Sequence, residues 1–400
     1  MKLFENLGLS TQLTETIQKM GFTKPTQIQE KSIPHIVTGK DVIGESETGS
    51  GKTLAFGCGI IEQVIPKAGL QALILTPTRE LAEQVKNAVR QFAHNKSLNI
   101  ITVYGGVSIG PQIDELPRAE VVIATPGRLL DHLERRTINT SKIRLLVLDE
   151  ADRMFDMGFI DDVEKIIRAC PSKRQTLFFS ATITPRIKDL AGRYMVSPVK
   201  VFAGKHVDPS KLRQVYYDTP KNMKLSMLVH LLRKEKAGLC MVFCNTRKNT
   251  DFVAKNLKAN KVNAVAIHGG FSQNKRTRTI QLFDNAKVSV LVCTDVAARG
   301  LDIDNVSHVY NYDLPKDPND YVHRIGRTAR AGESGKVINL LCEYDYENFS
   351  RIQREYSTFT IEKMEKPYLE RAICIRDHNP RRFGRQPMYG HQRFSRFRRR

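Results

Sequence analysis

The sequence predicts two α/β domains in tandem, each built on a parallel β-sheet, followed by a basic tail. Its 400 residues exceed the roughly 250 to 300 at which a single hydrophobic core stops growing. Short β-branched apolar runs alternate with longer amphipathic stretches, which is the pattern of parallel strands joined by helical crossovers. This alternation occurs twice, on either side of a polar segment that contains Gly204 and Pro209.

Six apolar runs in the first half have the length and composition of strands, and they lie near Asp41–Gly44, Ala72–Thr76, Ile100–Tyr104, Val121–Ala124, Leu145–Leu148 and Thr176–Phe179. Six further runs follow in the second half, at Val215–Asp218, Cys240–Phe243, Ala264–Ile267, Val288–Cys293, His308–Tyr312 and Lys336–Leu341. We therefore expect one domain over residues 1–203, a linker over 204–212, a second domain over 213–370 and a tail over 371–400.

The net charge points to a polyanionic partner. The formal charge is +21, and residues 371–400 contribute ten Arg and one Asp to it, which leaves about +12 in the rest of the chain. A partner would therefore touch the folded body as well as the tail. The alternative is a basic protein that its charge merely keeps soluble. Because the tail has little aliphatic surface to offset its ordering entropy, we expect it to be disordered when free.

The cysteines and the amino terminus indicate the compartment. The seven cysteines are scattered, and most lie in apolar runs, so we expect buried thiols in a reducing environment and neither disulfides nor a protein-held zinc ion. Residues 1–6 do not open a signal peptide, and no apolar run approaches the roughly 20 residues that span a bilayer. We expect a cytoplasmic protein without a membrane partner.

A glycine-rich segment, Ser46–Thr53, follows the first predicted strand and matches the nucleotide pattern Gly-x-x-x-x-Gly-Lys-Ser/Thr, except that Ser46 replaces the first Gly. In such a turn the backbone N–H groups face a phosphate chain, and the following helix adds its positive end. The backbone expected to bind ATP is that of Thr48, Gly49, Ser50 and Gly51. Lys52 would reach the outer phosphates and Thr53 would bind Mg²⁺. An ordinary Gly-rich turn is the alternative.

Two adjacent acids, Asp149 and Glu150, follow the apolar strand Leu145–Leu148. They lie at the carboxyl end of a predicted parallel strand, where α/β sheets bind ligands. Asp149 suits a direct or water-bridged Mg²⁺ contact, and Glu150 suits the orientation and deprotonation of an attacking water. Two such acids alone often belong to a solvated loop, but together with Lys52 in this order they predict a site that hydrolyses ATP.

The residues Asp149-Glu150-Ala151-Asp152 spell the name of a family, and from about Phe4 to about residue 345 the chain resembles a DEAD-box RNA helicase of superfamily 2. The resemblance implies two tandem RecA-like domains. It also implies ATP hydrolysis coupled to RNA binding, with local, non-processive unwinding of RNA duplexes or remodelling of RNA–protein complexes. Within the family, the segments Leu148–Phe159 and Tyr312–Pro315 resemble bacterial members of the RhlB or RhlE type.

The resemblance assigns nucleotide and coupling roles to further residues. Gln27 would pair with the adenine edge, because an amide offers both a donor and an acceptor. Phe4 stands where the family places an aromatic that stacks on the base, and plain core packing is the alternative. Asp302 would accept a hydrogen bond from the ribose. Ser180 and Thr182, whose hydroxyls alone suit a helix cap, would couple hydrolysis to RNA binding.

The resemblance also implies an RNA-binding surface. Its contacts are expected to be mostly with the RNA backbone, so sequence preference should be weak. The expected contact residues are Pro77, Arg79, Gly106, Thr125 and Arg128 in the first half and Gln273, Arg276, Thr294 and Arg299 in the second. Each of the first-half segments in isolation has the composition of an ordinary surface turn.

The second half contains His323–Arg330, in which arginines spaced by three would share one face of a helix. Arg327 and Arg330 would contact the γ-phosphate, where an arginine finger contributes about 10³ to 10⁵ in rate. A basic helix that binds RNA is the alternative, and the family more commonly has Gly where Ala329 stands. No phosphate loop follows the strand Met241–Phe243, so we expect the second domain to complete the first domain's site.

Two rival functions follow from the same features. A related motor that acts on DNA would not require 2′-hydroxyls for its stimulation. An RNA-annealing or scaffold protein would carry its activity in the tail, where Phe383, Phe394 and Phe397 lie among arginines and suit base stacking. A solubilising role for the tail is the alternative to RNA binding. Ribosomal and RNA-decay assemblies are the partners that the resemblance suggests.

Overall fold

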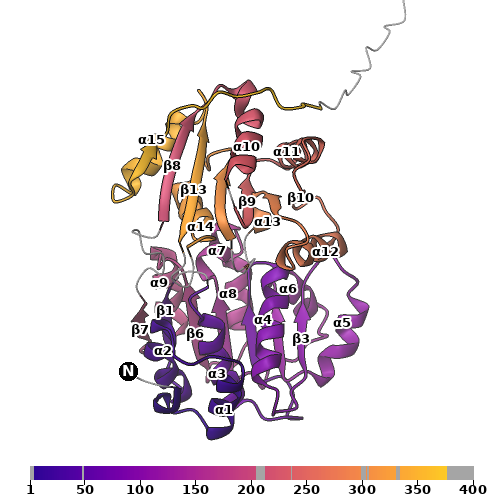
Figure 1. The fold of residues 1–400 in the computed structure, drawn as a ribbon. Helices are drawn as coiled ribbons and strands as arrows, with labels where there is room; N and C mark the ends of the chain where they lie inside the picture. Colours follow the sequence, from indigo (N-terminus) through magenta and orange to yellow (C-terminus); the bar gives the residue numbers. More distant parts are fainter. Residues whose placement is uncertain are drawn as a thin grey trace, which may run out of the picture.

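The chain folds into two α/β domains, each with a seven-stranded parallel sheet, and Figure 1 shows one domain above the other. The computed structural model describes residues 4–46, 49–203, 212–235, 237–298, 303, 306–329 and 334–375. The expected fold class is confirmed, because every strand pair in both sheets is parallel and helices connect the strands.

The first sheet has the strand order β3-β4-β2-β5-β6-β1-β7. Its strands are β1 (Val42–Glu45), β2 (Ala72–Leu75), β3 (Ile100–Val103), β4 (Val121–Ala124), β5 (Leu145–Asp149), β6 (Gln175–Ser180) and β7 (Val199–Phe202). The helices are α1 (Thr11–Lys19), α2 (Gln27–Val37), α3 (Lys52–Gln63), α4 (Arg79–Phe92), α5 (Gly110–Glu115), α6 (Pro126–Glu134), α7 (Ala151–Asp156), α8 (Ile160–Arg168) and α9 (Pro185–Tyr194), with short 3₁₀ turns at Phe4–Leu7 and Leu116–Arg118. Alternate strand residues feed two separate apolar cores, one on each face of the sheet.

The second sheet has the order β10-β11-β9-β12-β13-β8-β14. Its strands are β8 (Leu212–Asp218), β9 (Leu239–Phe243), β10 (Ala264–Ile267), β11 (Val290–Cys293), β12 (Val306–Asn311), β13 (Gly335–Leu341) and β14 (Ile361–Lys363). The helices are α10 (Lys224–Lys234), α11 (Arg247–Ala259), α12 (Gln273–Asp284), α13 (Asp295–Ala298), α14 (Pro318–Ile325) and α15 (Tyr346–Glu355), with a 3₁₀ turn at Lys221–Met223. This sheet also has an apolar core on each face.

All twelve predicted strands are present, and the two that the apolar pattern missed are the edge strands β7 and β14. Three of the four residues of β7 are partly or fully exposed, and none of the three residues of β14 is buried. An edge strand with exposed side chains does not need the continuous apolar run that marks a strand buried on both faces.

The two sheets have the same strand arrangement, so β8 occupies the place of β1 and α10 the place of α3. The expectation that β9 leads into the counterpart of the glycine-rich loop is therefore wrong, because that counterpart follows β8. There Pro220 and its neighbours contain no glycine, and Lys224 begins α10 as Lys52 begins α3. The Lys224 ammonium is buried and lies 2.7 Å from Asp345 Oδ2.

The domain boundaries differ slightly from those expected. Leu212, the last residue of the expected linker, is the first residue of β8, and residues 204–211 lie outside the described part of the chain. The second domain also extends beyond residue 370, because Ala372 N–H donates to Ser226 Oγ at 3.0 Å and the following residues bond to α11. The remainder of the expected tail, residues 376–400, lies outside the described residues.

Six of the cysteines are buried free thiols, as expected, and Cys374 is exposed. Burial raises the pKa of the Cys170 thiol to about 11 and that of Cys240 to about 12. Among the described residues, no helix combines the length and the apolar character that a membrane crossing requires.

The segment that carries Arg327 is not helical, contrary to the three-residue spacing argument. Helix α14 ends at Ile325, and Ala329 has φ of +57°, the left-handed conformation. A Cβ makes that conformation unfavourable by about 1 to 2 kcal/mol. The backbone is held there by its neighbours, since Thr328 Oγ1 donates to Val306 O at 2.5 Å and the turn packs on Gly335.

Ala329→Gly should raise the free energy of unfolding of the second domain by about 1 kcal/mol. Glycine removes the strain of the left-handed conformation, and the greater conformational entropy that it gives the unfolded chain cancels only part of this gain. Urea unfolding followed by circular dichroism measures this, since the chain has no Trp. Ala259→Gly, at the end of α11, is the matched control and should be destabilising by about 0.5 to 1 kcal/mol. A loss of stability in both variants would contradict the assignment of a strained left-handed conformation to Ala329.

Candidate functional site

The glycine-rich loop lies between β1 and α3 and is closed by its own side chains. Gly49 and Gly51 have φ of +80° and +88°. Lys52 Nζ donates to Ser46 O at 2.9 Å, and Ser50 Oγ donates to Ser46 Oγ at 2.9 Å. Ser46, which replaces the first Gly of the pattern, thus ties both ends of the loop together. Thr53 is the second residue of α3, and Thr48 lies outside the described residues.

The start of α2 and the residue before it hold this loop from outside. Thr26 Oγ1 donates to Ser50 O at 2.8 Å, and Gln29 Nε2 donates to Gly51 O at 3.0 Å. Gln29 Oε1 accepts from Thr26 N–H at 2.9 Å, so its amide spans the helix start and the loop. A Cβ on Gly51 would lie 2.2 Å from Gln29 Nε2, which makes glycine necessary there.

Gln29 is therefore a site residue that the motif alone did not single out. It is buried, 2% exposed, whereas Gln27 is the exposed first residue of α2. The signal that would have found Gln29 is the spacing Thr26-x-x-Gln29, the pattern of a capping box at a helix start. Phe4 is also 2% exposed and belongs to one of the two apolar cores of the first domain. Its position fits core packing, the alternative to stacking on the base.

The acid pair lies at the end of β5, where it was expected. Asp149 and Glu150 are each 3% exposed, and Glu150 has the left-handed φ of +53°. Burial raises the pKa of Asp149 to about 7; the nearby Lys52 opposes this rise and Glu150 adds to it. A positive φ in a residue with a side chain costs free energy, so the surrounding structure has to hold the backbone of Glu150 in this conformation. The turn aims both carboxyl groups at the loop edge of the sheet.

The pair Ser180 and Thr182 is bonded to Asp152 of the acid motif, which is also the second residue of α7, so Ser180 accepts from a helix start as its helix-cap alternative expects. Ser180 Oγ accepts from Asp152 N–H at 3.2 Å and donates to Thr182 O at 2.8 Å. Asp152 Oδ2 accepts from Thr182 N–H at 3.0 Å and from Thr182 Oγ1 at 3.1 Å. Because Ser46 N–H also donates to Ser180 O at 2.9 Å, the loop, the acid motif and this segment form one hydrogen-bonded unit.

The second domain meets the acid pair through Arg153. Arg153 Nε lies 3.5 Å from Glu150 Oε2, and Arg153 Nη2 contacts His323 Nδ1 on α14. Arg327 follows α14 and lines the same small hollow as Arg153 and His323. Arg330 and Asp302, which were expected here, lie outside the described residues. The structure thus brings Lys52, Asp149, Glu150 and Arg327 to the junction of the two domains.

A second junction gathers arginines from both domains. Glu80, on α4, accepts from Gln273 Nε2 at 3.0 Å and lies 2.8 Å from Arg276 Nε, both on α12. Burial lowers the pKa of Arg79; Glu80 opposes this, while the positive charges of Arg276 and Arg128 add to it. Three guanidinium groups therefore lie within electrostatic range of one another, which fits the surface that a polyanion binds.

The other expected contact residues surround these arginines. The Arg79 guanidinium packs against Gly106, whose Cβ would lie 2.0 Å from Arg79 Nη1. Arg128 Nη2 donates to Val107 O at 3.0 Å, and Thr125 precedes α6. The remaining expected residues, Pro77 and Thr294, are buried after β2 and β11, and Arg299 lies outside the described residues.

Three buried polar atoms at this junction form no hydrogen bond within the described chain, Arg128 Nη1, Gln273 Oε1 and Arg276 Nε, although the last forms an ion pair with Glu80. Buried polar groups are almost always hydrogen-bonded, so such atoms indicate a missing ligand or water. A guanidinium N–H suits a phosphate oxygen, and an amide oxygen suits a hydroxyl donor. Both groups are present in a ribonucleotide backbone.

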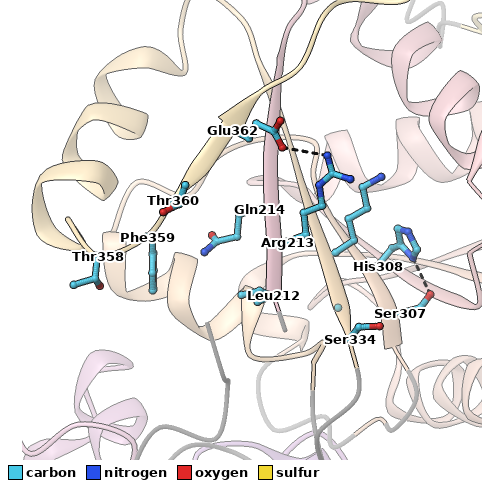
Figure 2. A pocket seen from close by; sticks show the side chains of 12 residues that line it. Leu212, Arg213, Gln214, Ser307, His308, Ser334, Thr358, Phe359, Thr360 and Glu362 are labelled. Atoms are coloured by element: carbon cyan, nitrogen blue, oxygen red, sulfur yellow. Dashed lines mark hydrogen bonds and ion pairs between the residues drawn. The ribbon is translucent and has the colours of Figure 1, made fainter. Parts of the chain in front are cut away.

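A hollow of about 810 Å³ elsewhere on the second domain is separate from these junctions. Figure 2 shows it between the strands β8, β12, β13 and β14, with Arg213 paired to Glu362 and His308 bonded to Ser307. None of the described residues that line it was expected to bind ATP or RNA.

Comparison with known proteins is consistent with this geometry. Residues 26–190 match the DEAD/DEAH box helicase family, and residues 223–332 match the helicase conserved C-terminal domain. The DEAD-box ATP-dependent RNA helicase CshA of Bacillus subtilis is 41% identical over 374 residues, which cover 92% of this chain and 75% of that protein. CshA of Listeria monocytogenes is 41% identical over 377 residues, covering 94% of this chain and 72% of that protein.

Two solved structures have the same two-domain arrangement. S. cerevisiae Dbp5 bound to RNA and ADP BeF3 aligns with a TM-score of 0.83 and 31% identity, over 91% of this chain and 96% of that one. Mss116p bound to single-stranded RNA and AMP-PNP aligns with a TM-score of 0.80 and 28% identity, over 91% and 78% of the two chains.

The subgroup expected within the family is wrong. The bacterial relatives at about 41% identity are CshA proteins rather than RhlB or RhlE. The segments Leu148–Phe159 and Tyr312–Pro315 misled the assignment because both follow the carboxyl ends of strands, β5 and β12, near the site. Residues that build a shared site do not discriminate between members that share it.

Gln29→Ala should raise the Kd for ATP roughly fivefold to thirtyfold, because it removes one hydrogen bond to Gly51 O in the loop and one to Thr26 N–H at the start of α2, each worth about 1 kcal/mol. Titration with a fluorescent ATP analogue measures the change. Gln27→Ala is the matched variant, two residues earlier on the same helix. A larger effect of Gln27→Ala would show that Gln27 pairs with adenine and that Gln29 only supports the loop.

Glu80→Gln should raise the RNA concentration that half-maximally stimulates ATP hydrolysis by about tenfold or more, because charged hydrogen bonds contribute about 1.5 to 3 kcal/mol. ATP affinity without RNA should be unchanged. Glu83→Gln is the control, since Glu83 lies on the same helix but bonds to Thr102 within the first domain. Equal effects of the two substitutions would refute a role for Glu80 between the domains.

Proposed function

We propose, since this chain belongs to the DEAD-box family of ATP-dependent RNA helicases, that it separates short stretches of RNA duplex or remodels RNA–protein complexes without processive travel. Family membership makes it an ATPase and an RNA helicase. The local mode is inferred from the junction of the domains. The observation that carries it is the contact of Arg153 with Glu150 in one domain and with His323 in the other.

ATP would lie at the loop edge of the first sheet, with its phosphates on the backbone N–H groups of Thr48, Gly49, Ser50 and Gly51 and on the Lys52 ammonium. Asp149 fits a divalent cation, because its carboxyl is buried and its pKa is raised mainly by that burial, which a bound cation would offset. Thr53 and Asp149 would hold Mg²⁺, which neutralises charge on the phosphates during transfer.

Glu150 would orient and deprotonate the attacking water. Arg153 Nε, 3.5 Å away, fixes the position of this carboxylate. Arg327 and Arg330 would stabilise the γ-phosphate and Asp302 would accept from the ribose, so the second domain completes the site. We propose that Gln27 pairs with adenine and that Phe4 stacks on it. The buried Gln29, whose amide bonds to Gly51 O of the loop, is the competing candidate for pairing with adenine.

RNA would bind across the second junction. The expected contacts are Pro77, Arg79, Gly106, Thr125 and Arg128 from the first domain and Gln273, Arg276, Thr294 and Arg299 from the second. Because these contacts are mainly electrostatic and with phosphates, affinity should fall steeply with salt and depend little on sequence. Ribosomal and RNA-decay assemblies are proposed as the source of such RNA.

The two sites would be coupled because each is made of both domains. ATP and RNA both stabilise the closed arrangement, so each raises the affinity for the other. The hydrogen-bonded unit of Asp152, Ser180 and Thr182 would transmit loss of the γ-phosphate from the loop to the RNA side. The two RNA- and nucleotide-bound structures with TM-scores of 0.83 and 0.80 support a closed arrangement of this kind.

Arg330→Ala should abolish RNA-stimulated ATP hydrolysis, a loss of about 10³ or more, while ATP binding stays within about twofold of the unmodified protein. Hydrolysis is measured with RNA and with DNA of the same sequence. Stimulation by RNA alone supports the RNA helicase, and equal stimulation by DNA supports the DNA motor.

Lys52→Ala is the companion variant and should lose ATP binding itself. Arg351→Ala is the control, because Arg351 is an exposed residue of α15 paired with Glu347. Unchanged turnover in Arg330→Ala would refute a site shared by the two domains.

A further inference from the structure

A hollow of about 940 Å³ opens at the carboxyl ends of β8, β9, β12 and β13 in the second domain. Because the two sheets have the same strand arrangement, it corresponds to the edge at which the first domain is proposed to bind ATP. An extended segment that follows β14 forms one wall of it through Arg371 and Ala372. Figure 1 shows this segment in yellow, at the end of the second domain that is farther from the first.

The charged residues of this hollow include more unpaired cations than unpaired acids. Two of its acids are already bonded within the domain, Asp345 to Lys224 Nζ at 2.7 Å and Asp313 Oδ2 to Asn249 Nδ2 at 2.6 Å. Glu343 is exposed and unpaired. Three exposed cations also line the hollow and form no ion pair with a described residue: Lys221, Lys316 and Arg371. This balance favours a ligand with negative charge.

Exposed apolar side chains gather around the same hollow. Tyr344 lines it and is 70% exposed, with Lys221 Nζ 4.7 Å from the centre of its ring. Tyr346, at the start of α15, and Ile373, next to Ala372 of the wall, are exposed as well. Large apolar side chains that are exposed together mark surfaces where proteins bind, and Tyr and Arg often contribute most of the binding energy there.

Two free amides complete the lining. The side chains of Asn222, in the 3₁₀ turn before α10, and Asn348, on α15, form no hydrogen bond within the described part of the chain. An amide can bond to both the N–H and the C=O of a peptide backbone. The same domain uses an amide in this way, because Asn260 accepts from Ile373 N–H at 3.0 Å and donates to Ile373 O at 2.8 Å. Free amides in the hollow therefore suit an extended peptide.

The lining is less suited to a nucleotide or a nucleic acid. The residues between Thr219 and Lys224 include no glycine, so no turn exposes a row of backbone N–H groups to phosphate. Phosphate groups would also lie beside the carboxylates of Asp313 and Glu343, which repel them. A peptide avoids both problems, since it carries its charges on separate side chains and has apolar side chains between them.

We propose that this hollow binds an extended, acidic segment of a partner protein. Its carboxylates pair with the three free cations, its backbone bonds to the two free amides, and one of its apolar side chains packs on Tyr344. The hollow shares no lining residue with the small hollow that contains Arg153 and His323 at the junction of the domains. The partner can therefore stay bound while the two domains open and close.

Selection of twelve-residue peptides from a phage library, with the full-length chain as bait, tests this proposal. We expect the selected peptides to have a net negative charge and at least one aromatic or large aliphatic residue. A fluorescein-labelled copy of a selected peptide should bind with a Kd that rises about tenfold or more in Lys316→Glu/Arg371→Glu, because two attractive contacts become repulsive. Failure to select peptides, selection of neutral or basic ones, or equal affinity for this variant overturns the proposal.

Three further measurements keep the outcome specific to the hollow. Lys258→Glu/Lys287→Glu makes the same change in charge at exposed residues of this domain outside the hollow, and it should bind the peptide as the unmodified chain does. Asn222→Ala/Asn348→Ala leaves the charge unchanged and should raise the Kd about fivefold or more. All three variants should keep the RNA-stimulated ATPase rate. Equal losses in the two charge variants, or displacement of the peptide by a single-stranded RNA, would show that the hollow is not a peptide site.

Discussion

The arrangement of the two domains depends on how one buried arginine is satisfied. Arg153 lies in the first domain, where Glu150 neutralises it at 3.5 Å, but it also reaches His323 of the second domain. An arginine cannot lose its proton in a protein, and a buried one without partners is strongly unfavourable. The closed arrangement supplies the second partner. The same contact positions the carboxylate proposed as the base, so closure and the geometry for hydrolysis are linked through one side chain.

A second contact between the domains, at Glu80, relates domain closure to the binding of a polyanion. Glu80 holds both Gln273 and Arg276, and burial lowers the pKa of Arg79, to which the positive charges of Arg276 and Arg128 add, so like charges gather there at an energetic cost. A polyanion placed among them relieves that repulsion. RNA bound as proposed at this junction would therefore favour closure, and closure would complete the proposed nucleotide site. Linkage of this kind is reciprocal, which requires that ATP strengthen RNA binding to the same extent.

The parts of the structure that sequence could predict are those with a strong local signature. Buried parallel strands need continuous apolar runs, and the acid pair and Lys52 follow from the chemistry of phosphate transfer. The edge strand β7 left no such run because its side chains are exposed. Gln29 escaped notice because its role depends on a contact with Gly51, 22 positions along the chain. The turn at Ala329 was misread as helix because spacing alone does not reveal a positive φ.

The contrast between Lys52 and Lys224 supports the proposal that the two domains share one nucleotide site. Both lysines begin the helix after the corresponding strand of identically ordered sheets. Among the described residues Lys52 donates to a loop carbonyl, which a phosphate can replace, whereas Lys224 forms a buried ion pair with Asp345 at 2.7 Å. Removal of Lys224 from that pair would leave a buried carboxylate uncompensated, and no glycine lies between Thr219 and Lys224 to admit phosphate to the backbone. The second domain therefore lacks the means by which the first domain is proposed to bind a triphosphate, which supports the proposal that its arginines act on the one that the first domain holds.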